Sequence, residues 1–334
     1  LAALAKPFLY FARTWAWVLG VRCAERAGKG IRTAPRDALV ADSIAPGQRG
    51  RAFGIHRAGD TAGAMVGIGV AALIVFASQR GAIGLGRETF QRIVLWSVIP
   101  AVLAVIVLAV GVREARRPVR RDADDRPPRL VWSDLEPRFR RYLLILLVFT
   151  LGNSSDAFLI LRAKTGGLSI LGVLWMMATF NLVYALASTP AGVLSDRLGR
   201  KRLLLAGWGV YAVVYLGFAL LRQGWQAWVL MAVYGLFYGM TEGVAKALIA
   251  DLVPAMQRGT AYGFYSAGVG LAALPASVIA GLLWQGVGAW NGLGPSAPFV
   301  WGAALAACAA LLLWRMPLPR PADADGGSLR GGTG

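Results

Sequence analysis

Two stretches of this chain repeat each other 209 positions apart. Residues 38–59 read ALVADSIAPGQRGRAFGIHRAG and residues 247–268 read ALIADLVPAMQRGTAYGFYSAG, with about half of the positions identical. Each copy closes one apolar segment, makes a short Gln-Arg-Gly turn and opens the next segment. A repeat of this period that carries several apolar segments predicts a membrane protein built from two related halves.

The composition also indicates a membrane protein. Hydrophobic residues make up 57% of the chain, charged residues 16%, and the mean hydropathy is +0.56. The formal net charge of +18 does not indicate nucleic-acid binding, because the arginines stand in short blocks between apolar stretches, as topology signals do. Cys23 and Cys308 form neither a metal-ligand spacing nor a disulfide framework.

Apolar segments of about 20 residues, the length that crosses a bilayer, recur along the whole chain. We expect them to be helices, because lipid cannot satisfy exposed backbone groups. About ten run roughly over 1–12 (clipped), 15–44, 50–77, 92–112, 141–163, 169–190, 203–221, 225–253, 259–286 and 297–315. The predicted fold class is all-α and polytopic. It has an incomplete N-terminal bundle of about four spans at 1–112, a basic linker at 113–140, a C-terminal six-helix bundle at 141–316 and a disordered tail at 317–334.

Lysine and arginine set a predicted orientation. The arginine-rich linker and the turns at Arg49 and at Arg197–Arg202 fall on one side, and few cations fall on the other. Because cytoplasmic loops are enriched in positive charge, we expect a multi-pass protein of the cytoplasmic (inner) membrane whose linker and C-terminus are cytoplasmic.

The segment Gly192–Arg202, GVLSDRLGRKR, joins two predicted spans. Its pattern, Gly-x-x-x-Asp-Arg-x-Gly-Arg-Lys/Arg, resembles the loop found in each half of the major facilitator superfamily (MFS) of secondary transporters. The resemblance covers nearly the whole chain. It implies an MFS fold of two pseudo-symmetric bundles with twelve spans, about ten of them present here, and transport by alternating access.

The resemblance also implies a gating role for this loop. Asp196 is expected at the N-terminus of a neighbouring helix, the one that opens near Gly259, where a carboxylate meets free N–H groups. Arg200 is expected to pair with an acid at a helix end, Asp251. The candidate gating residues are Gly192, Asp196, Arg197, Gly199, Arg200, Asp251 and Asp42, which stands at the repeat position of Asp251.

The repeat also predicts an N-terminal truncation. Counting back 209 positions from Gly192 leads to a position before Leu1, so the first-half copy of the loop is expected to be missing. The arginine partner expected for Asp42 is missing with it. We expect about 70 absent residues that carry two helices.

The span predicted over 15–44 carries a basic stripe. Arg26 and Gly30 resemble an Arg-x-x-x-Gly element of the family's fourth helix, and Lys29 can pair with Glu25 one turn before it. Ionisable groups at membrane depth usually face a cavity or each other, so Arg26 and Lys29 are candidates for substrate contact. The alternative is that the stripe's arginines snorkel at the helix ends, as expected for Arg22 and Arg36.

The next span holds His56, Arg57 and Asp60, spaced so that Asp60 faces both other side chains. A proton relay through the single histidine is one interpretation. An internally paired cluster near the cytoplasmic end is the favoured one, and Asp60 remains a substrate or proton candidate.

The same span has glycines that resemble the Gly-x8-Gly-x3-Gly antiporter motif of the family's fifth helix, without its proline. They are Gly54, Gly63 and Gly67. The match favours export weakly, because small residues at this spacing also allow close helix packing.

After the linker, Asn153 and Asp156 lie about one turn apart at mid-depth of a span. Asp156 is a candidate for substrate contact or reversible protonation, because burial favours the neutral carboxyl. The alternative, given equal weight, is a structural ion pair with Arg162 or with another helix.

The second half carries a stripe at i+4 spacing that comprises Tyr234, Tyr238, Glu242 and Lys246. Its helix resembles the family's tenth, which lines the central cavity. Tyr238, Glu242 and Lys246 are therefore candidates for binding an amphipathic substrate or for carrying protons. The alternative is core tyrosines plus an internal Glu242–Lys246 pair.

The sequence shows no Walker loop, dinucleotide fingerprint, metal cluster or nucleophile with its base, so we predict no enzyme, no cofactor and no metal. The predicted function is secondary active transport of a small molecule, with proton-coupled export as the first choice. The alternatives are a metabolite symporter, with an anion as one option, and a non-transporting truncated remnant. The expected partners are the lipid bilayer, the substrate and protons, for a monomer that binds no nucleic acid.

Overall fold

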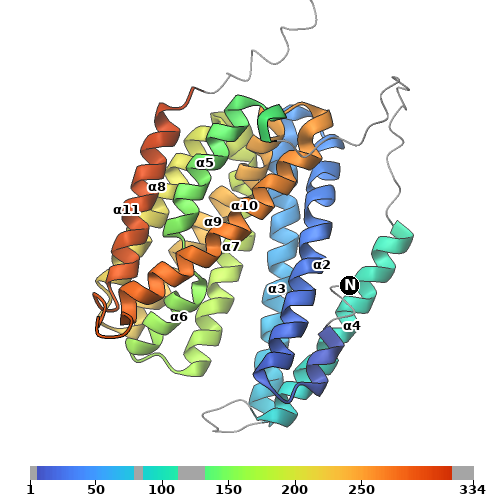
Figure 1. Cartoon of the computed structure of the whole chain (residues 1–334). Coiled ribbons are helices and arrows are strands. Elements are labelled where there is room, and N and C mark those ends of the chain that lie inside the picture. Colours follow the sequence, from blue (N-terminus) through green and yellow to red (C-terminus); the bar gives the residue numbers. More distant parts are fainter. Residues whose placement is uncertain (1–5, 79–85, 112–131, 318–334) are drawn as a thin grey trace, which may run out of the picture.

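The computed structural model describes residues 6–78, 86–111 and 132–317, and in these ranges the chain forms helices joined by turns (Figure 1). The helices before the linker are η1 (Lys6–Phe11), α2 (Trp15–Asp42), η2 (Pro46–Gln48), α3 (Arg49–Ser78) and α4 (Arg87–Gly111). Those after it are η3 (Trp132–Asp134), α5 (Pro137–Gly152), α6 (Asp156–Thr165), α7 (Ile170–Leu198), α8 (Arg200–Ala219), α9 (Gly224–Leu252), η4 (Ala255–Gln257), α10 (Arg258–Gln285) and α11 (Ala297–Arg315). The prediction of an all-α polytopic fold is confirmed.

Many helices present apolar side chains on the outside of the molecule. Phe76, Leu186 and Val213 are each about two-thirds exposed. Seven segments, with α5 and α6 counted as one, are long and apolar enough to cross a membrane. Of the other predicted spans, α2 carries a stripe of charged residues and α9 carries several glycines and tyrosines, which lower their hydropathy. The described part of the segment predicted over 1–12 is the short helix η1.

The span predicted over 141–163 is broken in the middle. Helix α5 ends at Gly152, and α6 begins at Asp156 with the Ser155 hydroxyl accepting the Ala157 amide at 3.3 Å. The prediction of one continuous helix is therefore wrong. The apolar pattern of the sequence continues across the break. For this reason it does not reveal that Asn153–Ser155 are not helical.

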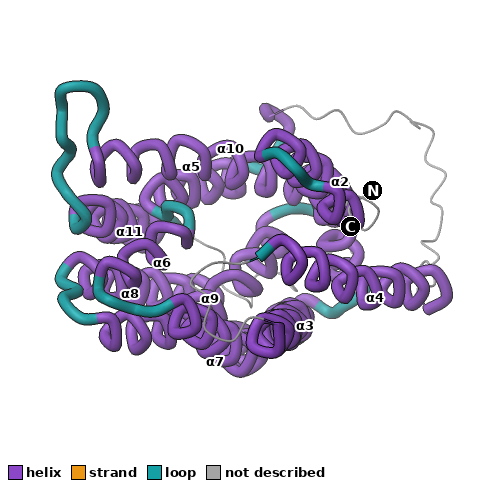
Figure 2. Tube along the Cα trace, turned by 90° about the horizontal axis from the view of Figure 1, so that it is seen from below, coloured by secondary structure: helices purple, strands orange, loops and turns teal. Residues whose placement is uncertain are grey.

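The helices form two groups that meet along two lines of contact. Helices α2, α3 and α4 make up the first group, and α5 to α11 the second (Figure 1). Helix α10 lies beside α2, and α7 lies beside α3 (Figure 2). Most of the buried core lies in the second group, around Tyr142, Trp208 and Tyr211.

Helices α3, α7 and α9 approach closely where the two groups meet. A Cβ on Gly54 of α3 would collide with the backbone of Ser188, and one on Gly243 of α9 would press on Phe53. By contrast, a Cβ on Gly63 or Gly67 would meet nothing within 4 Å. Of the three glycines in the partial antiporter motif, only Gly54 is needed here for close packing.

Candidate functional site

Two ion pairs join the groups in a reciprocal way. Arg49, at the start of α3, donates to Asp251, at the end of α9, with an N–O distance of 2.8 Å. Arg258, at the start of α10, donates to Asp42, at the end of α2, at 2.6 Å. Arg49 and Arg258 are equivalent positions of the repeat, and so are Asp42 and Asp251. Each arginine therefore binds the acid of the opposite half.

These pairs define one end of the molecule, which we call the closed end. It comprises residues 42–51, 196–200 and 251–259. In Figure 1 the ribbons of the two groups diverge away from this end. The arginine partner of Asp42 was expected in a first-half copy of the loop, and therefore among the missing residues. The structure supplies Arg258 from the second half instead.

Asp196 binds the N-terminus of a helix from the opposite group. Its two carboxylate oxygens accept the backbone amides of Gly50, at 3.0 Å, and Arg51, at 2.8 Å. These amides open α3, where free N–H groups and the helix dipole favour an anion. The predicted kind of contact is present, but the predicted helix, the one opening near Gly259, is wrong. Asp196 reaches the equivalent helix of the other half.

Arg200 links the loop to the ion pairs. Its guanidinium donates to Asp196 at 2.9 Å and also binds Asp251. The predicted pairing of Arg200 with Asp251 is therefore present, and Asp251 binds Arg49 as well. Arg197, also named as a gating candidate, is exposed at the end of α7.

Two glycines of the loop are explained by backbone geometry. Gly199, between α7 and α8, has a φ of +95°, a conformation that residues with a side chain rarely adopt. Gly192 lies against the backbone of Gly50, and a Cβ there would overlap the Gly50 carbonyl. The first group can therefore approach α7 this closely only because Gly50 and Gly192 both lack side chains.

Glu242 of α9 also binds across the groups. It pairs with Arg57 of α3 and accepts the hydroxyl of Tyr184 from α7. Arg57 in turn holds Asp60 at 3.1 Å. The predicted Arg57–Asp60 contact is present, while His56 is half-buried on the same helix. The predicted internal pair of Glu242 with Lys246 is wrong, because α3 and α7 supply Glu242 with better-placed partners.

Lys246 instead binds Asp37 of α2, with 2.6 Å between Nζ and Oδ2. Both residues are buried, with 1% of Asp37 and 5% of Lys246 exposed. They stand 209 positions apart, so equivalent residues of the two halves bind each other. Asp37 was missed as a site residue. An acid and a base at equivalent repeat positions were the signal that could have found it.

The basic stripe of α2 is only partly described. The side chains of Arg26 and Lys29, the predicted substrate contacts, lie outside the described residues, and so does the predicted Glu25–Lys29 pair. Glu25 is buried and binds Arg22 at 3.1 Å. Arg32 is exposed.

The break between α5 and α6 brings polar groups into the aromatic core of the second group. The Asn153 side-chain oxygen accepts the hydroxyls of Tyr215, at 3.3 Å, and Tyr234, at 3.4 Å. Tyr234 also donates to Asp156 at 3.2 Å. The break thus places an amide and a carboxylate against a cluster of tyrosines.

The alternative pairing of Asp156 with Arg162 is wrong. Arg162 points to the end of α8 and donates to the backbone carbonyls of Phe218, Ala219 and Leu221 at 2.8–3.3 Å. These carbonyls belong to the last turn of α8 and the residues after it, where they lack helical partners.

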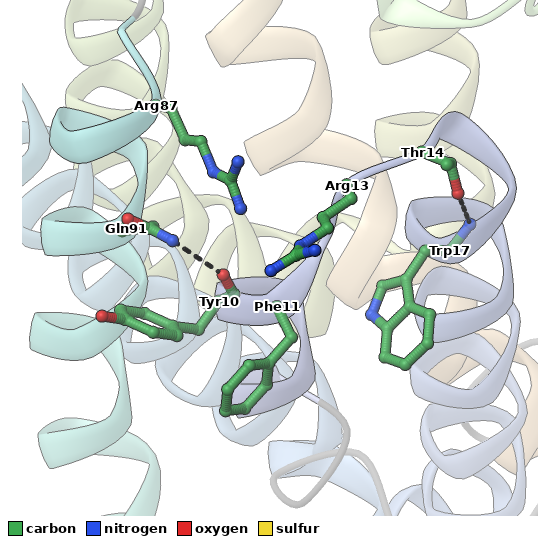
Figure 3. A pocket seen from close by; sticks show the side chains of 7 residues that line it. All are labelled: Tyr10, Phe11, Arg13, Thr14, Trp17, Arg87 and Gln91. Carbon is green, nitrogen blue, oxygen red and sulfur yellow. Dashed lines mark hydrogen bonds between the residues drawn. The ribbon is translucent and has the colours of Figure 1, made fainter.

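A pocket of about 500 Å³ lies at the opposite end of α2 from the closed end (Figure 3). Its lining comprises Tyr10, Phe11, Arg13, Thr14, Trp17, Arg87 and Gln91. The Gln91 amide donates to the Tyr10 carbonyl at 3.1 Å, and Thr14 caps α2 through the Trp17 amide. None of the predicted site residues lines this pocket.

The fold and the inter-group contacts define a class, a polytopic membrane transporter of two helix bundles. The model of the Major Facilitator Superfamily matches residues 1–171 and 158–332, and the chain belongs to this family. An uncharacterized MFS-type transporter of Methanocaldococcus jannaschii is 35% identical over 318 residues, which are 93% of this chain and 75% of that protein.

Two further likenesses are more limited. The multidrug resistance protein MdtG of Proteus mirabilis is 34% identical over 113 residues, covering 33% of this chain and 28% of that protein. The crystal structure of the human organic anion transporter MFSD10 (TETRAN) matches with a TM-score of 0.68 at 16% identity, over 93% of this chain and 74% of that chain. The likeness to the human protein shows the fold alone.

Proposed function

We propose that this MFS transporter is a secondary active carrier that works by alternating access, with the closed end as its cytoplasmic gate. The observation that carries the proposal is the reciprocal pairing of Arg49 with Asp251 and of Arg258 with Asp42. Each pair ties one bundle to the other and lies at one end only. Rocking of the bundles about the midplane breaks both pairs together and opens that end.

The loop after α7 completes the gate. Asp196 holds the N-terminus of α3, and Arg200 holds both Asp196 and Asp251. The loop thus contacts both sides of the Arg49–Asp251 pair. Asp196 binds the helix that carries Arg49, and Arg200 binds Asp251 itself. We assign this end to the cytoplasmic side of an inner membrane, because Arg197, Lys201 and Arg202 cluster in the loop.

For direction and coupling, we propose proton-coupled export of a small molecule by a monomer. The likeness to the multidrug resistance protein MdtG over a third of the chain supports export. Asp156 and Glu242 are carboxylates within the bundle that can carry protons. Glu242 is suited to this role because its partner Arg57 belongs to the opposite bundle and leaves when the bundles separate.

A second candidate is symport of an anionic metabolite. It is favoured by the stripe of arginines on α2, where Arg32 is exposed and Arg36 is only partly buried. A positive wall attracts anionic substrates. Uptake that rises with an inward proton gradient would support symport, whereas uptake into inverted vesicles would support export.

The gate is tested with Asp196→Asn and Arg200→Ala in vesicles that contain the purified protein. Both variants are expected to insert normally and to transport more slowly than the unchanged protein, because each removes a contact that closes the cytoplasmic end. Arg197→Ala is the matched control, since Arg197 is an exposed arginine of the same loop. Full transport by both gate variants would overturn the proposal.

A further inference from the structure

Asp156 differs in its partners from the carboxylates of α2, α3, α7 and α9. The acids of α2, α3, α7 and α9 each have a lysine or arginine within 4 Å. They are Glu25, Asp37, Asp42, Asp60, Asp196, Glu242 and Asp251. Within the described part of the chain, Asp156 forms no ion pair, and its contact is the hydroxyl of Tyr234 at 3.2 Å.

An ionised carboxylate with no countercharge is costly inside a membrane protein. Tyrosine hydroxyls donate hydrogen bonds, but they supply no positive charge. Asp156 is the first residue of α6, and the N-terminal end of that helix supplies only about half of a positive charge. Full neutralisation of the carboxylate therefore needs a cation that the described protein does not provide. A proton is one such cation, and a positively charged ligand is another.

The surroundings of Asp156 are aromatic. The ring of Tyr234 packs edge-on to Tyr238, with 5.0 Å between centroids. Tyr238 also contacts Phe180 at 5.5 Å and Tyr184 at 5.3 Å. Ring faces attract ammonium groups, because the negative face of the ring interacts with the positive charge. A carboxylate beside several tyrosine rings thus favours an organic ammonium over an anion.

Tyr238 also places this cluster toward the other bundle. It lies one helical turn before Glu242, which binds Arg57 of α3. Residues one turn apart share a face of a helix, so Tyr238 lies on the face of α9 that is turned to the first bundle. The aromatic cluster therefore extends toward the first bundle.

An inorganic cation fits this cluster less well. Calcium takes six to eight oxygen ligands, and magnesium requires octahedral geometry. The described residues hold no group of three or more histidines, cysteines or acids suited to a metal ion. Asn153 and Asp156 alone supply too few oxygens, whereas an ammonium needs only one carboxylate and aromatic contacts.

We propose that Asp156, with Tyr234 and Tyr238, binds the ammonium or phosphonium centre of a lipophilic organic cation, which exchanges with one proton at this carboxylate. Binding of the cation releases the proton, and rebinding of the proton releases the cation. One positive charge replaces another, so the exchange is electroneutral. This proposal rests on the proposed proton-coupled transport and names its substrate class.

The first test measures binding, which does not depend on transport. Radiolabelled tetraphenylphosphonium is titrated onto the full chain in detergent, and proton release is followed in weak buffer. We expect saturable binding with about one proton released per cation. Asp156→Asn is expected to bind at least about tenfold more weakly, the effect of about 1.4 kcal/mol, and to release no proton.

Matched variants separate the site from general folding effects. Glu88→Gln removes an exposed acid at the start of α4 and should leave binding unchanged. Tyr238→Phe keeps the ring and should retain binding, whereas Tyr238→Leu should weaken it. Equal affinity of Asp156→Asn and unchanged protein, or binding without proton release, would overturn the proposal.

A transport assay distinguishes failure of this site from failure of the proposed function. Vesicles with an imposed pH gradient are supplied with tetraphenylphosphonium, a neutral sugar or an organic anion. Transport of the sugar or the anion without any effect of the cation would overturn the cation site and leave the carrier function standing. Cation binding without transport of any probe would support the site and contradict the carrier function.

Discussion

Arg49 at the start of α3 binds Asp251 at the end of α9 at 2.8 Å, and at the equivalent positions of the repeat Arg258 binds Asp42 at 2.6 Å. Because each pair joins opposite bundles, neither contributes to the folding of a single bundle. The two ion pairs stabilise the protein only while the bundles are in contact at the closed end. Variants at these positions are therefore expected to change the conformational equilibrium more than insertion.

A cysteine at Ser188 can report this equilibrium. Ser188 is buried on α7, where α7 meets Gly54 of α3. The reporter cysteine is placed in a variant whose native cysteines, Cys23 and Cys308, are both exposed and are replaced with alanine. Labelling of Ser188→Cys by a membrane-impermeant maleimide should rise when the closed end opens.

Charge reversal tests the Asp42–Arg258 pair. Asp42→Arg or Arg258→Asp alone places like charges together and should increase labelling at position 188. The double variant, Asp42→Arg with Arg258→Asp, should return labelling toward the original level, with a coupling of about 0.5–3 kcal/mol. Additive effects of the two changes would show that the pair does not hold the closed end.

Gly192→Val should hinder closure. Its Cβ would overlap the carbonyl of Gly50 in the opposite bundle. Overpacking of this kind costs about 1–3 kcal/mol, which corresponds to roughly a 5- to 150-fold change in the equilibrium. The control is Gly209→Val on α8, where a Cβ meets nothing within 4 Å. Labelling should increase only for the Gly192 variant, and equal labelling of both would contradict the contact.

The buried Asp37–Lys246 pair predicts an asymmetry between single and double changes. Lys246→Met leaves the buried Asp37 carboxylate with Arg36, at 3.1 Å, as its remaining countercharge, and should destabilise the protein by up to about 3 kcal/mol. Asp37→Leu together with Lys246→Met removes both charges and should recover most of this loss. The melting midpoint in detergent is the measurement. A double variant less stable than the single one would show that the unpaired Asp37 charge is not the cause of the loss.

Arg162→Ala should destabilise the second bundle without altering the gate. It leaves the carbonyls of Phe218 and Ala219, at the end of α8, and of Leu221, after it, without their charged donor, a loss of about 1.5–3 kcal/mol. The expected result is a melting midpoint lower by several degrees, with labelling at position 188 unchanged. Lys164→Ala, a nearby exposed cation on α6, serves as control and should melt like the unchanged protein.

The sequence by itself determined the helical membrane architecture and one contact of the closed end. Apolar periodicity located most spans within a few residues, because the requirement to satisfy backbone groups in lipid acts along each segment. The loop motif with the repeat predicted that Arg200 meets Asp251, and the structure contains this pair. The motif also predicted that Asp196 binds a helix N-terminus.

Only the tertiary structure decided which charges bind across the bundles. Sequence spacing favoured Glu242 with Lys246, since an i+4 pair on one helix contributes about 0.2–0.5 kcal/mol. In the fold, Glu242 binds Arg57 and Tyr184, while Lys246 binds Asp37. Charges removed from water interact more strongly than exposed ones, so the partner brought close by bundle packing takes precedence over the local neighbour.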